Sequence, residues 1–158
     1  MGGEAKRTRR HLRPKSQACY SYSMEPNDQI SAPIVDHTNL THAQTAPIYG
    51  VISHYYLGSD YSPSVTFVLQ SLAVIEATAS ISEDGRGFFA TMSAIAKHAS
   101  LDLSTVDRVL TALEKAEILK RQHRPFKQSI FWITWENTLL GDEGANYLYA
   151  AQNLIWYN

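Results

Sequence analysis

The sequence has very little cysteine, no long apolar run and almost no net charge. A single cysteine, Cys19, excludes an internal disulfide and any zinc or iron–sulfur site built from several cysteines. No apolar run of about 18 residues is present, so we expect no membrane-spanning helix and no membrane partner. The basic N-terminus is not followed by an apolar stretch, so the expected location is the cytoplasm. The 14 basic and 15 acidic residues leave a formal net charge of −1, which excludes a uniformly basic nucleic-acid coat.

Motifs that carry catalytic or metal chemistry are missing as well. The sequence has no glycine-rich phosphate loop, no Gly-x-Ser-x-Gly elbow and no His-Glu-x-x-His. The six histidines do not provide a pair at helical ligand spacing with a third ligand nearby. Cys19 has only Lys15 as a basic neighbour in the sequence, which gives little support for a nucleophile. We therefore expect a non-enzymatic protein without a cofactor or a metal site.

The chain of 158 residues is 44% hydrophobic and 18% charged, which is enough apolar material for one folded domain. Its basic residues are concentrated in two regions, because residues 16–60 contain no Lys or Arg. Residues 1–15 carry one acid and six basic residues, which are Lys6, Arg7, Arg9, Arg10, Arg13 and Lys15. We expect these first residues to form a disordered arm that binds phosphates non-specifically, serves as a localisation signal or acts as a solubilising tail.

Residues 16–58 show no sustained helical period, and prolines such as Pro47 interrupt them. Each proline biases the residue before it toward extended backbone. We therefore predict a largely irregular segment here, in which the run from Tyr49 to Leu57 is the best candidate for an ordered piece.

The ordered core is predicted to begin with a helix. Ser62-Pro63 is a helix-start signal, and apolar residues at three- and four-residue spacing predict an amphipathic helix to about Ile81. Phe88-Phe89 is expected to form a short strand. Thr91 and Asp102 can each cap a further helix, because their side-chain oxygens can accept from backbone N–H groups two or three residues later.

A hairpin is predicted after the third helix, where the apolar period changes. Residues 120–123 and 129–135 flank a turn at 124–127, and the second stretch is rich in β-branched and aromatic residues. Trp132 and Trp135 are expected to lie in the core.

Six short sequence motifs lie between Tyr61 and Trp135, and their order along the chain carries the resemblance described below. They are Phe89-Ala90-Thr91, Ile95-Ala96, Thr105-Val106, Arg108-Val109-Leu110, Leu113-Glu114 and Ile118-Leu119-Lys120-Arg121. With the order of elements, they resemble the winged helix-turn-helix family of phage and plasmid replication proteins and bacterial regulators. The family usually has Gly where this chain has Ser100 and Glu117, and a left-handed residue other than Gly costs roughly 1 kcal/mol. The start of the recognition helix, often doubly basic in the family, is Leu103-Ser104 here.

The resemblance implies a DNA-binding protein of replication initiation or transcription control, with double-stranded DNA as its partner. The helix at 102–114 is expected to enter the major groove and the wing at 120–135 to contact the flanking phosphates. The expected DNA-binding residues are Leu103, Ser104, Thr105, Asp107, Arg108, Thr111, Lys120, Arg121, Arg124 and Lys127. The alternative is a non-enzymatic adaptor or structural subunit that uses the winged helix to hold a protein partner.

The expected fold is mainly α with a small β-hairpin. An irregular N-terminal arm covers 1–58, a winged helix-turn-helix domain covers 59–140, and an added C-terminal helix covers 141–158. A short apolar helix at a chain end must bury itself on its own domain or on a partner. We therefore predict that residues 143–157 contribute to a homodimer interface, and a replication or transcription protein is a further expected partner.

Overall fold

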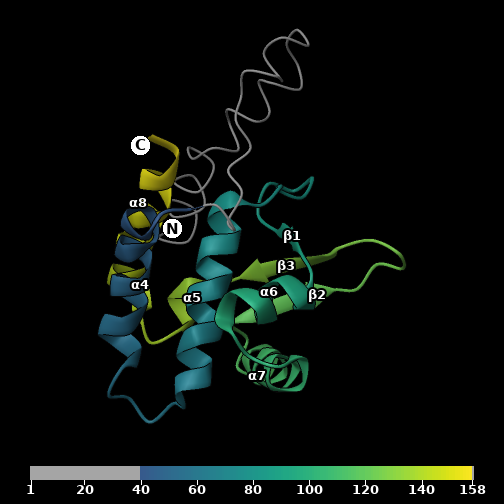
Figure 1. The fold of residues 1–158 in the computed structure, drawn as a ribbon, viewed down its shortest axis with the longest axis horizontal. Coiled ribbons are helices and arrows are strands. Elements are labelled where there is room, and N and C mark those ends of the chain that lie inside the picture. The colour runs from purple at the N-terminus through teal and green to yellow at the C-terminus, as the bar shows by residue number, and fades with distance from the viewer. Residues whose placement is uncertain (1–39, 158) are drawn as a thin grey trace, which may run out of the picture.

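The computed structural model describes residues 40–157. The six basic residues of the predicted arm and Cys19 lie outside the described residues. The described part is mainly helical with a three-stranded antiparallel sheet, which confirms the predicted winged helix-turn-helix fold class (Figure 1). In chain order the elements are α4 (His42–Tyr56), α5 (Pro63–Thr78), β1 (Phe88–Ala90), α6 (Met92–Ala99), α7 (Leu103–Lys115), β2 (Leu119–Gln122), β3 (Ser129–Ile133), the 3-10 helix η2 (Trp135–Asn137) and α8 (Gly141–Tyr157).

Helix α4 corrects the prediction of a largely irregular segment, which is wrong for residues 42–56. Thr41 and Gln44 form a capping box that satisfies two backbone donors at the start of the helix. Pro47 lies inside α4 and removes one helical hydrogen bond. Burial of Ile48 and Ile52 against α5 and α8 outweighs that loss, and such packing is not visible in the local period.

Helix α5 begins at the predicted signal, with Ser62 as its N-cap and Pro63 at its first position, and it ends at Thr78. The prediction of an amphipathic helix is wrong for its second half, because every residue from Ser71 to Thr78 is buried. Figure 1 shows α5 at the centre of the fold, with helices and the sheet around it. A helix that is surrounded by other elements has no face in contact with water, so it does not need a polar face.

The sheet has the strand order β1-β3-β2. Strand β1 confirms the short strand expected at Phe88-Phe89 and pairs antiparallel with β3, which places Phe88 opposite Phe131. The two rings are stacked with their centroids 5.7 Å apart. Strands β2 and β3 form the predicted hairpin, with Arg121 opposite Phe131. The wing is therefore anchored to the core through its central strand.

Helix α8 confirms the predicted C-terminal helix and packs against α4 and α5 (Figure 1). Ala145, Leu148 and Ile155 are buried on the chain's own core. Gln152 Nε2 donates to Glu76 Oε1 of α5 at 2.8 Å, and the indole N–H of Trp135 donates to the same oxygen at 2.9 Å. Both donors reach the same oxygen of this buried carboxylate, so the cluster ties α5, η2 and α8 together.

Candidate nucleic-acid interface

Helix α6 is held in place by its cap and by the core. The Thr91 hydroxyl accepts from the Ala94 N–H at 3.0 Å, as its N-cap position predicts. The ring nitrogens of His98 lie 2.9 Å from Ser71 Oγ of α5 and 3.3 Å from Tyr49 Oη of α4. Burial raises the pKa of the Tyr49 hydroxyl, against a smaller opposing effect of a hydrogen bond with Thr45, so it remains protonated. The helix-turn-helix is thus attached to the two N-terminal helices of the described part.

The turn between α6 and α7 uses a left-handed residue that is not glycine. Ser100 has a φ of 57°, and its N–H donates to carbonyl groups at the end of α6. The Leu101 N–H then donates to the Ala96 carbonyl at 3.0 Å. These bonds satisfy carbonyl groups that the end of a helix leaves open, which explains why the conformation is kept without Gly.

Helix α7 begins at Asp102, as the sequence predicts. The Asp102 carboxylate accepts from the Thr105 N–H and hydroxyl at 3.2 and 2.6 Å, and also from the Ser104 hydroxyl. Hydrogen bonds from Ser104 and then from Thr105 hold the pKa of this carboxyl well below its usual range. Asp102 therefore keeps its negative charge at the positive end of the helix dipole.

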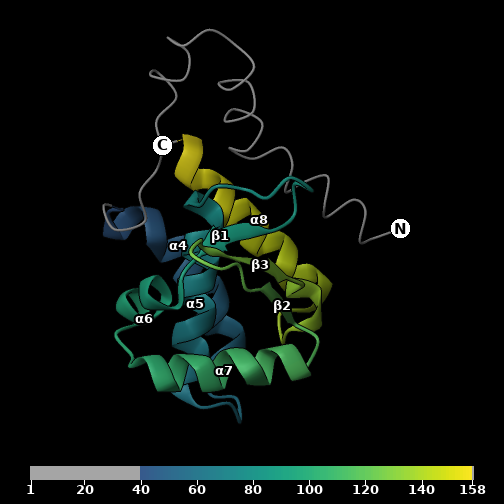
Figure 2. The ribbon, with the colours of Figure 1, turned by 90° about the vertical axis from the view of Figure 1, so that its right-hand side faces the viewer.

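The two faces of α7 differ sharply. Its inner face is apolar and buried, through Val106, Val109, Leu110 and Leu113. Of the predicted DNA-binding residues on this helix, Leu103, Ser104, Asp107 and Arg108 are exposed, and Thr105 and Thr111 are half-buried. Figure 2 shows α7 along the lower edge of the molecule, open along its length. An exposed helix of this kind on a rigid support fits a DNA major groove.

Arg121 of β2 is directed at side chains of α7. Its guanidinium lies 3.1 Å from Asp107 Oδ1 and 3.1 Å from Glu114 Oε1, and it also donates to the Thr111 hydroxyl at 3.4 Å. Arg121, Asp107 and Thr111, all predicted to bind DNA, are thus brought together, and the contacts that hold them are hydrogen bonds and an ion pair within the chain. Arg121 ties the first strand of the wing to α7 and pairs with two carboxylates of that helix.

The other basic side chains of the wing lie over aromatic rings or at the tip. Lys120 Nζ is 5.2 Å from the centroid of the Trp132 ring, and the Arg124 guanidinium is 4.6 Å from that of Phe89. The Arg124 side chain also donates to the Gln128 carbonyl at 2.7 Å. Lys127 is exposed. The cations are therefore held along the hairpin.

The loop before β1 supports the wing from its other side. Trp132 Nε1 donates to Asp84 Oδ2 at 2.9 Å. Trp132 is half-buried on the wing, so the prediction that it lies in the core is wrong, whereas Trp135 is fully buried as predicted. Partial burial opposes ionisation of Asp84, but hydrogen bonds from Ser82, Trp132 and the backbone N–H groups of Arg86 and Gly87 outweigh it and hold its pKa well below the usual range. Sequence periodicity did not reveal this contact, because it joins residues 48 positions apart.

Phe126 is an exposed residue beside the predicted site residues that the sequence prediction did not include. It stands at the tip of the wing between Pro125 and Lys127, and its side chain is completely exposed. The only sequence signal is a large aromatic residue in a turn flanked by basic residues. Among the described residues there is no group of three potential metal ligands and no helix long and apolar enough to cross a membrane.

Comparison with known proteins gives one result. Residues 89–126, from β1 to the tip of the wing, match the MarR family. Neither a curated protein nor a solved structure matches the chain. MarR family regulators are non-enzymatic, in agreement with the expected absence of enzyme activity, and the match lends no support to replication initiation. Residues 89–126 are therefore similar to the MarR family, whose winged helix-turn-helix is typical of DNA-binding transcription regulators.

Proposed function

We propose that the protein controls transcription by placing α7 in the major groove of duplex DNA and the wing on the flanking phosphates. The observation that carries this proposal is the exposed outer face of α7 beside a hairpin that has basic residues and no acid between Ile118 and Trp135. From residue 97 to residue 127 there are seven basic and four acidic residues, a net charge of +3. Two of those acids, Asp107 and Glu114, are paired with Arg121. The surface offered to DNA is thus positive although the whole chain is nearly neutral.

Arg108 is the residue we assign to direct contact with a base or a phosphate. It is exposed on the outer face of α7 and forms no ion pair with any other described residue. Its planar guanidinium can donate two hydrogen bonds to guanine O6 and N7. Arg121, by contrast, acts as a positioning residue, because its donors are directed at Asp107, Glu114 and Thr111. Lys120, Arg124 and Lys127 then supply the phosphate contacts.

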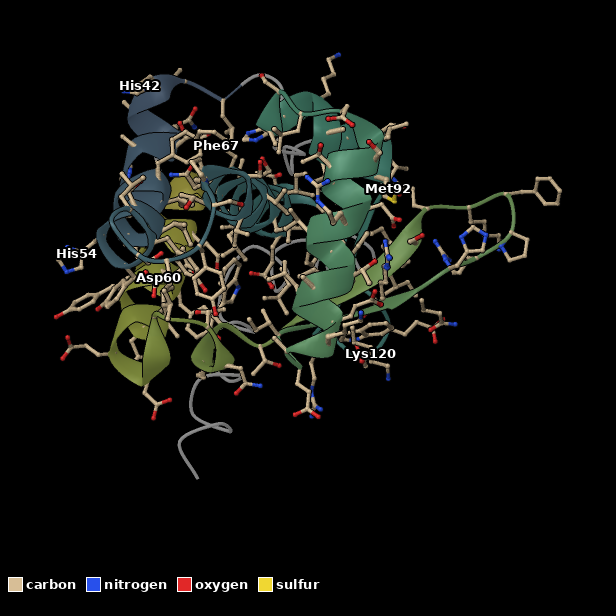
Figure 3. All side chains as sticks on the ribbon, turned by 90° about the horizontal axis from the view of Figure 1, so that it is seen from below. His42, His54, Asp60, Phe67, Met92 and Lys120 are labelled. Carbon is tan, nitrogen blue, oxygen red and sulfur yellow. The ribbon has the colours of Figure 1, made fainter. Side chains whose placement is uncertain are left out.

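A fluorescence-anisotropy titration of labelled duplex fragments at several salt concentrations tests this function. The wild-type affinity is expected to fall steeply with salt, with a log–log slope of about −0.9 for each neutralised phosphate. Arg108→Ala is expected to weaken binding by about 5- to 150-fold. Ala43→Glu, at an exposed position in the first turn of α4, changes the net charge by the same amount but lies away from α7, near His42 in Figure 3, and should bind like the wild type.

Absence of duplex binding at the lowest salt concentration would contradict the proposal and favour the adaptor function. Equal losses in Arg108→Ala and Ala43→Glu would also contradict it, because they would show a response to net charge without a local contact.

A homodimer through residues 143–157 remains part of the proposed function, since a regulator of this type reads two half-sites with two copies of its helix. Most apolar residues of α8 are buried on their own chain. Tyr147 and Leu154, seven residues apart and therefore on one side of the helix, are 57% and 47% exposed. They are the residues we assign to contact between copies. Tyr147→Glu combined with Leu154→Glu is expected to convert a sedimenting dimer into a monomer, and an unchanged dimer would contradict the assignment.

A further inference from the structure

The tip of the wing presents one aromatic ring entirely to solvent. Phe126 has a relative exposure of 107%, the highest among the large apolar side chains of the described residues. Its backbone is left-handed, with a φ of 58°. For a bulky residue this conformation is a real outlier, and such outliers collect at ligand-binding sites. An exposed ring and a strained backbone at one position call for a specific physical reason.

The two other left-handed residues that are not glycine have a reason within the fold. Ser100 ends α6, where its N–H donates to the carbonyl groups of Ala96 and Lys97. Glu117 follows α7, where its N–H donates to the Glu114 carbonyl and its own carbonyl accepts from Asn137 Nδ2. Phe126 lies at no helix end and covers no part of the core. Its positive φ follows from its place as the third residue of the hydrogen-bonded turn from Arg124 to Lys127, which has Pro125 at its second position, as in a type II turn. The turn accounts for the backbone, but no packing within the described residues accounts for a ring exposed at this place.

The turn that carries Phe126 is nevertheless well held. The Lys127 N–H donates to the Arg124 carbonyl at 3.2 Å, and Arg124 Nε donates to the Gln128 carbonyl at 2.7 Å. Pro125 restricts the backbone immediately before the ring. A ring on such a turn is preorganised, so little conformational entropy is lost when it meets a ligand.

The surroundings of the ring define the chemistry of its ligand. Arg124 and Lys127 flank it, His123 precedes it, and no acidic residue occurs between Ile118 and Trp135. The matching ligand must therefore offer a flat apolar surface between negative groups. Stacked bases between two phosphate backbones meet both requirements. An apolar pocket on a protein meets the first requirement alone.

We propose that Phe126 inserts between two base pairs from the minor groove that adjoins the major-groove segment contacted by α7. This inference rests on the proposed function, because it takes the position of α7 as given. Seven residues of extended chain separate Leu119 from Phe126 and reach at most roughly 23 Å. The major groove is only about 12 Å wide, so the tip can cross the flanking backbone into the next groove. Figure 1 shows the hairpin projecting well beyond α7.

Insertion of a ring unstacks a base step and kinks the duplex. Pyrimidine–purine steps such as TA unstack most readily, so Phe126 selects sequence through deformability without a hydrogen bond to a base. A regulator with few cations on its recognition helix gains specificity from such a wedge.

The test uses the full chain and a duplex of about 30 alternating A·T base pairs with 2-aminopurine in place of several adenines. The fluorescence of 2-aminopurine rises when it is unstacked, and anisotropy of an end label reports binding in the same sample. Wild-type protein is expected to bind and to raise the fluorescence. Phe126→Ala should bind about 5- to 150-fold more weakly and leave the fluorescence unchanged. Phe67→Ala, a matched change at an exposed Phe of α5 on the side of the molecule away from the wing, should behave like the wild type (Figure 3).

Phe126→Gly separates the ring from the backbone conformation. Gly adopts a positive φ without strain, so this variant should be at least as stable as the wild type in urea and still lose the fluorescence signal. The result that would overturn the inference is wild-type binding without a fluorescence rise and with equal affinity in Phe126→Ala, an outcome that leaves the proposed function intact. Failure of the wild type to bind any duplex at low salt overturns both. A change of sedimentation in DNA-free Phe126→Ala would assign the ring to contact between copies and would also overturn the inference.

Discussion

The helical half of the molecule, formed by α4, α5, η2 and α8, and the recognition half, formed by α6, α7, β2 and β3, use polar side chains in opposite ways. In the helical half, Glu76, Trp135 and Gln152 come from three elements and are buried together, and the Trp135 indole and the Gln152 amide both donate to one carboxylate oxygen of Glu76. In the recognition half, Asp107, Glu114 and Arg121 are paired at the surface, where water could satisfy them equally well.

The difference shows where stability and function are located. Removal of a buried partner leaves another buried polar group unsatisfied, which is expensive. Removal of a surface partner returns the remaining group to water at little cost. The buried polar contacts of the helical half are therefore expected to contribute strongly to stability, whereas the surface ion pairs of the recognition half can change with little effect on folding.

The largest expected effect is that of Trp135→Ala. Loss of this fully buried indole removes packing and a donor to Glu76, and we expect the free energy of unfolding to fall by about 3–5 kcal/mol. Urea denaturation followed by circular dichroism measures it. The matched control is Trp132→Ala at the half-buried position on the wing, which should cost clearly less. Equal losses of unfolding free energy in Trp135→Ala and Trp132→Ala would contradict the difference between the helical half and the recognition half.

A smaller effect of opposite sign is expected at the end of α7. Glu117 has a φ of 61°, and replacement by Gly relieves the left-handed strain, so Glu117→Gly should raise the free energy of unfolding by about 1 kcal/mol or less. Glu117→Ala removes the same carboxylate but keeps the strain and should bring no gain. A gain of equal size in both variants would assign the effect to the charge instead of the backbone.

The pH dependence of stability tests the loop that supports the wing. Because the pKa of Asp84 is lowered in the folded protein, its contribution is fully present above the unfolded value of about 3.9 and is lost as the pH falls toward the folded value. The urea midpoint of the wild type is therefore expected to decline below about pH 5, and in Asp84→Asn this decline should be shallower. If the urea midpoints of the wild type and of Asp84→Asn fell equally steeply with pH, the hydrogen bonds to Asp84 would not stabilise the fold.

The smallest effect on stability is expected from Asp107→Asn. This variant removes one of two ion pairs of Arg121 at a side chain that is 54% exposed, so the free energy of unfolding should change by less than about 1 kcal/mol. Duplex affinity should rise, because a negative charge leaves the face of α7 that meets phosphates. Anisotropy and urea denaturation on the same sample separate the two quantities. A large loss of stability would contradict the division between the two halves.

Local signals were sufficient for the helix-turn-helix and the hairpin. The caps at Thr91 and Asp102, the start of α5 at Pro63 and the two strands of the wing all follow from side chains that act within a few residues of themselves. Helix α4 was missed because Pro47 is unfavourable locally, and only packing on α5 and α8 compensates for it. The burial of α5 on all sides was missed for a related reason, since its neighbours come from distant parts of the chain.

Local periodicity and composition are enough to predict the order of the elements from α5 to the wing, the buried face of α7 and the absence of acidic residues from the wing. Only the tertiary structure decided that Arg121 is directed at Asp107 and Glu114, that Gln152 reaches Glu76, and that the ring of Phe126 stands alone at the tip. Each of these depends on which distant side chains arrive at the same place. That outcome follows from the packing of the whole chain and not from the preference of any one segment.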